Sequence, residues 1–448
     1  MGTGPVRTTL MSVVVAVSLS GLLFGFDTAV ISGVTDALRL HYDLSAAALG
    51  ITVSSALVGT MLGAATAGIL GDRRGARSGL RWAAALYLIS GLGCALAWGW
   101  FSLLAFRIMA GIAIGVSSVL APIYLAEIAP AARRGAIVGG FQVSIVIGIL
   151  LAYVCNAAVD ALISNPTIAW RWKLGCTALP AAIFQFLMVR VPDSPRWLTM
   201  RGRTDEATAA SLSLYGHAPI QEEIVSAVSH GTVSLASLWT EARRPMILAI
   251  VIGALNQLTG INAILYYLND IFAAAGFAQV SANLQAIAVG VANLIFTIVG
   301  MTLIDRVGRR PLLLVGGAAM AVLLTVATAI MLGMLPKFLM VGVLVCFIAA
   351  FATSQGAVIW VYMSEIFPAR FRAAGQALGA GTVWLFDALV SAVFPVAAAM
   401  SPAIPFAFFA VCMVVQCILV FRLFPETKEA SLEEIERRML GARQGPAQ

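Results

Sequence analysis

Gly71-Asp72-Arg73-Arg74-Gly75-Ala76-Arg77 and Ile304-Asp305-Arg306-Val307-Gly308-Arg309-Arg310 are two versions of one short charged stretch, 233 residues apart (305 − 72) and each flanked by long apolar runs. A second pattern repeats 238 residues apart (365 − 127), because Glu127 and Glu365 each stand seven residues before an arginine, Arg134 and Arg372. Two independent motifs with nearly the same offset indicate one structural unit written twice. In a membrane protein, a twofold repeat is typical of a transporter whose binding site lies between the repeats.

The composition places the chain in a membrane. Of its 448 residues, 60% are hydrophobic and only 11% are charged, and the mean hydropathy is +0.94. A soluble domain carries about 25% charged residues, so this chain has too few polar groups to cover its surface. Its apolar runs approach the roughly 20 residues of a spanning helix, and the short alternating strands of a membrane barrel are missing from the sequence. We predict an all-α membrane protein with twelve spans, at residues 10–35, 46–70, 79–99, 101–126, 136–159, 171–191, 245–273, 282–304, 311–332, 337–364, 372–398 and 402–424.

The spans predict two six-helix halves, residues 1–192 and 245–424, joined by the polar segment 193–244 and followed by the polar tail 425–448. The joining segment is expected to be a small cytoplasmic helical insert. If both termini are cytoplasmic, most of the 28 Lys and Arg residues lie on the cytoplasmic side, as the positive-inside rule requires. We therefore expect a multi-pass protein of the cell (inner or plasma) membrane. The net charge of +7 is spread over many short loops, which does not indicate a nucleic-acid partner.

Two charged residues lie inside predicted spans of the first half and away from the span ends, Asp27 and Arg107. A carboxylate at membrane depth costs about 3 kcal/mol on insertion scales, and a guanidinium cannot lose its charge, so each needs a partner. Paired, they form a switch in which ionised Asp27 binds Arg107 and protonated Asp27 releases it. The alternatives are a purely structural ion pair, or an Arg107 that reaches the interface with its long side chain.

Amide and aromatic residues in otherwise apolar spans form a second candidate site. Amides that donate and accept hydrogen bonds, beside flat aromatic faces, suit the hydroxyls and C–H faces of a neutral polyol. Gly260 is expected to unwind its span and to turn the amides on either side toward one cavity. The alternative is hydrogen bonding between helices. The candidate residues are Gln142, Asn256, Gln257, Asn262, Asn293, Trp360 and Trp384, with the buried acid Asp387 as a sugar ligand, a second proton site or a packing residue.

The repeated charged motifs are expected to act as a cytoplasmic gate. Their acids can accept hydrogen bonds from helix N-termini or nearby arginines, and Glu127–Arg134 and Glu365–Arg372 can bridge helix ends. Plain positive-inside anchoring would explain the arginines but not the acids placed with them. The gate residues are Asp72, Arg73, Glu127, Arg134, Asp305, Arg306, Glu365 and Arg372. No nucleophile–base set or metal-ligand cluster stands in the spans, so neither an enzyme nor a metal or other cofactor is expected beyond the proton as coupling ion.

Taken together, these motifs resemble the sugar porter family of the major facilitator superfamily over nearly the whole chain. The segments that carry the resemblance are Asp72-Arg-Arg-Gly-Ala-Arg77, Arg107 through Pro122-Ile-Tyr124-Leu-Ala-Glu127 to Gly135, Pro192-Asp-Ser-Pro-Arg-Trp-Leu198, Gln257-Leu-Thr-Gly-Ile-Asn262, Asp305-Arg-Val-Gly-Arg-Arg310, Ser364-Glu-Ile-Phe-Pro368 and Pro425-Glu-Thr-Lys428. The resemblance implies alternating access by rocking of the two halves. It places Gln142, Gln257, Asn262, Asn293, Trp360 and Trp384 where the family binds sugar, and Asp27 with Arg107 where bacterial xylose–proton symporters keep their coupling pair.

The resemblance favours a proton-coupled importer of a neutral monosaccharide such as glucose, galactose or xylose, working as a monomer. Animal facilitative glucose carriers have Asn at the position of Asp27, which separates this chain from them. A facilitative uniporter and a non-transporting sugar sensor are the alternatives. The chain departs from the family pattern at Asn256 (usually Gln), at Gly356 through Trp360 (no proline), at Asp387 (often Asn) and at Ile149 (Gln in the xylose symporter), which leaves the identity of the sugar open.

Overall fold

The computed structural model describes residues 10–130, 133–216, 235–368 and 370–428, except for the side chains of residues 235–236, 279–281, 305, 372 and 373. Within these ranges the chain is helical and contains no strand. Eleven helical segments of the described residues are long and apolar enough to cross a membrane. The remaining predicted span, 79–99, is helix α4 (Ala76–Ala95), whose 20 residues also match the thickness of a bilayer. The prediction of an all-α membrane protein with twelve spans is confirmed.

The chain divides into two compact units. Unit 1 comprises Met1–Asp43 and Ser55–Ser229, and unit 2 comprises Leu44–Ser54 and His230–Gln448. The boundary falls inside the predicted insert 193–244, so its first part groups with unit 1 and its last part with unit 2. The start of the second span also groups with unit 2, although the sequence repeat assigns it to the first half.

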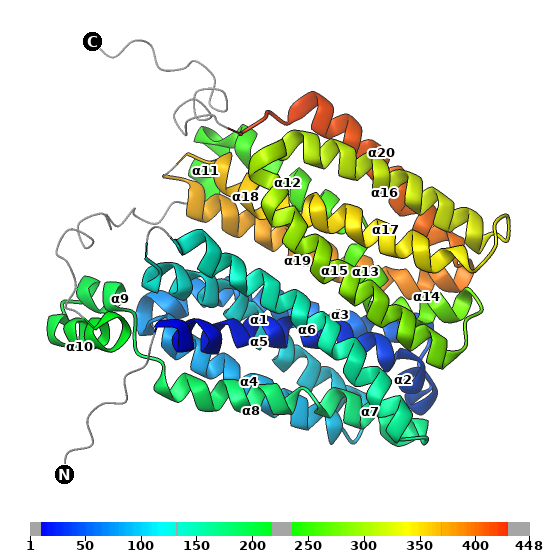
Figure 1. Cartoon of the computed structure of the whole chain (residues 1–448), viewed down its shortest axis with the longest axis horizontal. Coiled ribbons are helices and arrows are strands. Elements are labelled where there is room, and N and C mark those ends of the chain that lie inside the picture. Colours follow the sequence, from blue (N-terminus) through cyan, green and yellow to red (C-terminus); the bar gives the residue numbers. More distant parts are fainter. Residues whose placement is uncertain (1–9, 131–132, 217–234, 369, 429–448) are drawn as a thin grey trace. The chain divides into compact units, whose positions relative to one another are not determined.

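In unit 1 the long helices run side by side, with α1 against α6 and α4 against both α5 and α8 (Figure 1). Small residues allow some of these helices to touch through their backbones. A Cβ atom on Gly111 of α5 would lie only 1.9 Å from the carbonyl oxygen of Ala56 on α3, so the two helices approach closely at this glycine. The elements are α1 (Leu10–Val30), η1 (Ile31–Gly33), α2 (Thr35–Tyr42), α3 (Ala46–Arg74), α4, α5 (Trp100–Ile128), α6 (Arg134–Leu162), α7 (Pro166–Gly175) and α8 (Ala178–Arg190).

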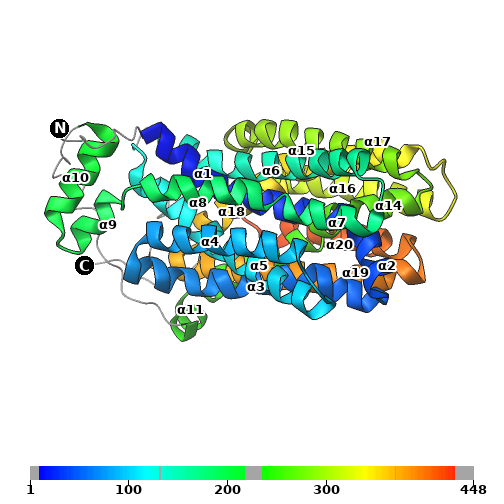
Figure 2. The same cartoon turned by 90° about the horizontal axis from the view of Figure 1, so that it is seen from below.

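Two short helices, α9 (Pro195–Met200) and α10 (Thr204–Tyr215), follow α8 and lie at one end of this bundle (Figure 2). Ser194 caps α9 by accepting a hydrogen bond from the backbone N–H of Trp197. Both helices lie within the segment 193–244 that is expected to be a helical insert. The polar tail beyond Lys428 lies outside the described residues.

Unit 2 repeats the helix pairings of unit 1, because α12 packs against α19 and α16 against α20. Two of its spans are interrupted, one between α12 and α13 and one between α17 and α18. The second break, at Ser354, forms without the proline common in the family. The elements are α11 (Leu235–Glu241), α12 (Arg243–Gln257), α13 (Ile261–Tyr266), α14 (Leu268–Ala274), α15 (Gln279–Val307), α16 (Arg309–Met331), α17 (Leu339–Thr353), α18 (Gln355–Glu365), α19 (Arg372–Met400) and α20 (Ala403–Leu423).

The sequence repeat is also a repeat of contacts. In unit 1 the Tyr124 hydroxyl donates to the carbonyl oxygen of Pro192 at 2.7 Å. In unit 2 the Tyr362 hydroxyl donates to the carbonyl oxygen of Pro425 at 3.0 Å. These residues are separated by the same offsets, 238 (362 − 124) and 233 (425 − 192), as the charged motifs. In each unit, therefore, a tyrosine of the fourth span donates a hydrogen bond to the backbone just after the last span.

Candidate functional site

Asp27 and Arg107 meet in the interior of unit 1. Asp27 lies near the end of α1 and Arg107 in the second turn of α5, and their side chains are 8% and 3% exposed. Nη1 of Arg107 donates to both carboxylate oxygens of Asp27, at 3.0 Å each. The alternative in which Arg107 reaches the interface is excluded, because its side chain is buried against Asp27.

The hydrogen bonding of this buried pair is weaker than that of the best arginine–carboxylate pairs. A single guanidinium nitrogen serves both carboxylate oxygens, whereas the strongest arginine–carboxylate pairs use two nitrogens side by side. Nε of Arg107 is buried and has no hydrogen-bond partner among the described residues. Removing the partner of a buried charge costs about 3–5 kcal/mol, so Arg107 cannot remain in place unpaired at low cost. Neutralising Asp27 would therefore disturb the interior of unit 1.

A second buried cation was not expected from the sequence. Lys173 of α7 is 3% exposed, lies 2.6 Å from the carboxylate of Asp160 on α6, and donates to the carbonyl oxygen of Gly33 at 2.7 Å. In the sequence Lys173 stands at the edge of the predicted span 171–191, where a cation can reach the interface. The one available signal was Asp160, an acid that the preceding helix carries near its end. This pair ties α6, α7 and η1 together.

In unit 2 the span that carries Asn256, Gln257 and Asn262 is broken, as predicted. Helix α12 ends at Gln257, Gly260 adopts a φ of +79°, and α13 begins at Ile261. A side chain on residue 260 would be strained at this φ and would also clash with the ring of Phe409. The break brings Asn262 back toward the end of α12, where its Nδ2 donates to Oε1 of Gln257 at 3.1 Å.

The amides at this break belong to a longer hydrogen-bonded row within unit 2. Gln257 donates to Asn256 at 3.2 Å, Asn256 donates to Gln355 at 3.2 Å, and Gln355 donates to Gln416 at 2.5 Å. At the other end Asn262 donates to Oδ2 of Asp387 at 2.7 Å. Gln355 and Gln416 were missed from the sequence, although an amide within an apolar span was the signal that identified the others. The structure thus joins four of the predicted sugar-site residues, Asn256, Gln257, Asn262 and Asp387.

The other predicted sugar-site residues are distributed more widely. Trp384 is buried on α19, one turn before Asp387, and Asn293 is buried on α15 with its side-chain oxygen accepting from Thr297. Trp360 on α18 is 44% exposed. Gln142 lies half-buried on α6 and so belongs to unit 1. Apart from Gln142, the candidate sugar residues therefore gather in unit 2.

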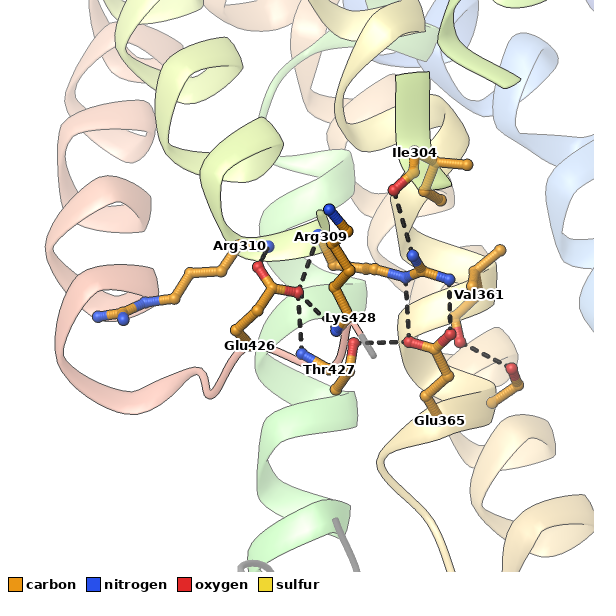
Figure 3. Close-up of polar contacts among 9 residues, drawn as sticks. Ile304, Arg309, Arg310, Val361, Glu365, Glu426, Thr427 and Lys428 are labelled. Atoms are coloured by element: carbon orange, nitrogen blue, oxygen red, sulfur yellow. Dashed lines mark hydrogen bonds and ion pairs between the residues drawn. The ribbon is translucent and has the colours of Figure 1, made fainter. Parts of the chain in front are cut away.

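The charged motif of unit 2 forms a compact cluster, drawn in Figure 3. Arg309, at the start of α16, holds Glu365 of α18 with two nitrogens, Nη2 at 2.8 Å and Nε at 3.2 Å. The Thr427 hydroxyl donates to the same carboxylate at 2.6 Å. Glu365 was expected to pair with Arg372, whose side chain lies outside the described residues. The partners found come instead from the second charged motif and from the Pro425–Lys428 segment.

Glu426 anchors the same segment to the start of α16. Its carboxylate accepts from the backbone N–H groups of Arg309 and Arg310 at 3.1 and 3.0 Å, and from those of Thr427 and Lys428 at 2.9 Å each. Partial burial acts to raise the pKa of Glu426, but the hydrogen bonds from these four N–H groups outweigh it and hold the pKa below its ordinary value. A carboxylate at a helix N-terminus also interacts favourably with the helix dipole.

Unit 1 has a different arrangement at the corresponding positions. Arg77 pairs with Asp193 at 2.7 Å, but the position equivalent to Arg309 is Ala76. Oε2 of Glu127 is consequently buried without a hydrogen-bond partner in the described part of the chain. The expected ion pair between Glu127 and Arg134 is not formed in this structure, in which the side chain of Arg134 is exposed.

The remaining predicted gate residues contribute mainly through their backbones. Asp72 and Arg73 are exposed in the last turn of α3, and Trp197 and Arg201 donate to the backbone oxygen of Asp72 rather than to its carboxylate. The backbone oxygen of Arg306 accepts from Nζ of Lys428 at 2.9 Å. The side chain of Asp305 lies outside the described residues. No group of His, Cys, Asp and Glu residues in the described ranges could hold a metal ion.

Comparison with known proteins decides the family. The model of the family described as sugar (and other) transporter matches residues 13–439. This chain belongs to the sugar transporter family. The arabinose–proton symporter of Bacillus subtilis is 35% identical over 94% of this chain and 93% of its own length. The D-xylose–proton symporter of Escherichia coli K12 is 34% identical over 95% of both chains.

Solved structures agree with this assignment. The inward open conformation of the xylose transporter XylE from E. coli matches with a TM-score of 0.85 and 31% identity, covering 96% of this chain and 100% of that one. The predicted membership of the sugar porters is confirmed, together with the all-α fold. The family consists of sugar transporters rather than enzymes, and its members reside in membranes.

Proposed function

We propose that this sugar transporter is a proton-coupled importer of a neutral monosaccharide, a hexose or a pentose, that works by alternating access. The observation that carries the proposal is the Asp27–Arg107 pair, a titratable carboxylate and a permanent cation buried together inside a membrane-spanning unit. The names of the arabinose–proton and D-xylose–proton symporters add support, because both relatives are similar over nearly the whole chain.

The sugar would be held mainly by unit 2. Its amide row contains several groups that both donate and accept hydrogen bonds, as sugar hydroxyls require. The half-buried Asn262 is the member of that row at the helix break, and broken helices at membrane depth are where transporters of other folds bind their cargo. Trp360 and Trp384 would offer their rings to the C–H faces of the sugar, and Asn293 would offer a further amide group.

The proton would act at Asp27. While ionised, Asp27 holds Arg107 and satisfies both charges. Protonation removes the negative charge and leaves a buried guanidinium without a counter-ion, at a cost of about 3–5 kcal/mol if nothing moves. That free energy is of the order that a two-state rearrangement requires, so proton binding would favour the state in which Arg107 finds other partners. One proton would thus be tied to each conformational cycle.

The charged clusters would secure the cytoplasmic ends of the helices. Both motif segments are rich in arginine, and the positive-inside rule then places them, and both termini, in the cytoplasm. Glu365–Arg309 and Asp193–Arg77 would hold these ends when the cytoplasmic side is closed. These contacts occur in both units and carry no information on the sugar.

Transport in proteoliposomes tests the proposal. Counterflow with a panel that includes D-xylose, L-arabinose, D-glucose and D-galactose is expected to identify at least one substrate. Addition of that sugar to weakly buffered, energy-depleted cells is expected to make the medium more alkaline, because sugar and proton enter together. Counterflow without alkalinisation would identify a facilitative uniporter, and absence of counterflow with every sugar would contradict sugar transport altogether.

A further inference from the structure

The amide row of unit 2 has a single direction. In every link the amide nitrogen of one residue donates to the amide oxygen of the next, beginning at Asn262 and ending at Gln416. An amide can be turned by 180° to exchange its donor and acceptor, so a row of amides has two directions that satisfy the links equally well. Something outside the row must therefore select the direction observed. The members, in order of donation, are Asn262, Gln257, Asn256, Gln355 and Gln416.

The Gln416 end of the row does not select the observed direction of the hydrogen bonds. Nε2 of Gln416 is buried and has no hydrogen-bond partner among the described residues. Reversal of the whole row would turn this nitrogen toward Gln355 and give it an acceptor. A buried donor without a partner is unfavourable, so this end favours the opposite direction if it favours either.

The selecting group stands at the other end, at Asp387. Oδ2 of Asp387 accepts from Nδ2 of Asn262 at 2.7 Å and from the Tyr266 hydroxyl at 3.3 Å, and Oδ1 accepts from the Ser391 hydroxyl at 3.3 Å. The residue is 1% exposed, and it forms no ion pair with any residue that the structure describes. In each of these three contacts a carboxyl oxygen of Asp387 is the acceptor, and Asn262 presents its nitrogen to it.

This contact determines which atom of Asn262 is left free. Nδ2 of Asn262 lies between Asp387 and Gln257 and donates to both. Oδ1 accepts no hydrogen bond from the described residues, and the side chain is half-buried rather than enclosed. Asn262 is therefore fixed with its nitrogen toward the protein and its acceptor oxygen unused.

We propose that Asp387 is a positioning residue that fixes the polarity of the amide row, so that Asn262 offers only an acceptor oxygen to the sugar. The inference rests on the proposed function in one respect, namely that Asn262 contacts the substrate. The transported sugar must then have a hydroxyl that donates to Asn262. With Asn at position 387, as in many family members, the amides would be free to turn and Asn262 would offer either atom.

Matched sugar analogues test the polarity. Monodeoxy and monofluoro analogues of D-glucose and D-xylose are compared as competitors of the parent sugar, one hydroxyl position at a time. Neither replacement can donate a hydrogen bond, so at the position facing Asn262 both are expected to bind about tenfold more weakly to the wild type. In Asp387→Asn, Asn262 can turn its N–H toward the fluorine, so the fluoro analogue is expected to bind at least threefold better than the deoxy analogue.

The control is Ser391→Ala, which removes a contact of Asp387 but keeps the carboxylate; its ratio of fluoro to deoxy affinity is expected to equal that of the wild type. The proposal would be overturned if the ratio of fluoro to deoxy affinity were the same in wild type and Asp387→Asn at every hydroxyl position. It would also be overturned if the wild type bound the fluoro analogue as tightly as the parent sugar at every hydroxyl position.

A sugar-free measurement tests the same contact independently. Asn262→Asp places a second acceptor against Asp387 and is expected to lower the apparent melting temperature. Combining it with Asp387→Asn exchanges donor and acceptor, allows the row to reverse, and is expected to restore most of the loss. A double variant no more stable than Asn262→Asp alone would overturn the inference. If no parent sugar binds the wild type, the proposed function fails, while this exchange still decides the role of Asp387.

Discussion

Glu365→Gln and Glu127→Gln are the same substitution at repeated positions, and we expect them to have different effects. Glu365 is held by two nitrogens of Arg309, in a pair whose side chains are 20% and 11% exposed. Exposed pairs contribute up to about 1 kcal/mol and the loss of a buried partner costs about 3–5 kcal/mol, so this half-buried pair is expected to contribute about 2 kcal/mol. That is roughly a 30-fold change in an equilibrium constant.

The assay is thermal unfolding of purified protein in detergent, read as an apparent melting temperature. Glu365→Gln is expected to lower it by roughly 4–8 °C. Glu127→Gln is expected to change it by less than about 2 °C or to raise it, because the carboxylate of Glu127 has an unpartnered oxygen and Ala76 stands where unit 2 has Arg309. A double-mutant cycle of Arg309→Met with Glu365→Gln is expected to give a coupling of about 2 kcal/mol. An equal decrease in melting temperature for Glu365→Gln and Glu127→Gln would contradict this reasoning. A coupling free energy near zero between Arg309 and Glu365 would also contradict it.

Other substitutions test other parts of the structure. Glu426→Gln is expected to cost about 1–3 kcal/mol at neutral pH. The folded-state pKa of Glu426 is lowered, so its contribution to the free energy of unfolding is complete above the unfolded pKa of about 4.3 and is lost as the pH falls through the folded pKa. The difference in stability between wild type and Glu426→Gln is therefore expected to narrow below about pH 4. A difference that widens there would contradict the assignment. Gly111→Leu is expected to reduce folded protein strongly, because its Cβ would meet the carbonyl oxygen of Ala56, whereas normal yield on size-exclusion chromatography would contradict this packing. Gly260→Ala is expected to cost at least about 1 kcal/mol through its positive φ and the ring of Phe409, and an unchanged melting temperature would contradict a fixed helix break.

Much of the fold was predictable because membrane burial leaves a strong signal in sequence. Long apolar runs predicted the spans, and the offsets of the charged motifs predicted two related units. Asp27 and Arg107 could be paired from sequence because each is costly to bury alone and few alternatives existed. Gly260 predicted the helix break because only glycine readily adopts the conformation that the break requires.

The partners in the charged clusters could not be predicted in the same way. The seven-residue spacing pointed to Arg372, whose side chain lies outside the described residues, and gave no sign that the fold brings Arg309 from another motif to Glu365. Local spacing identifies neighbours along a helix and does not identify the helix packed beside it. The burial of Lys173 was not predictable, because the edge of an apolar run does not reveal whether a cation faces a buried acid such as Asp160.

The two units divide their polar residues unequally, although their helices repeat. Unit 1 contains the buried ion pair of Asp27 and Arg107, and unit 2 contains the amide row that begins at Asn262, beside Asp387. The repeated scaffold thus holds a buried ion pair in one unit and a row of hydrogen-bonded amides in the other. In the proposed function, the first unit supplies the response to the proton and the second supplies recognition of the sugar.

Asp27→Asn tests the coupling of these two functions most directly. The substitution keeps the size of the side chain and a hydrogen bond to Arg107 but removes the group that binds the proton. In proteoliposomes with an imposed pH gradient, acid outside, the wild type is expected to concentrate sugar above the external level. The variant is expected to catalyse counterflow yet to fail to concentrate sugar at any gradient. Accumulation by Asp27→Asn equal to that of the wild type would contradict proton coupling through Asp27.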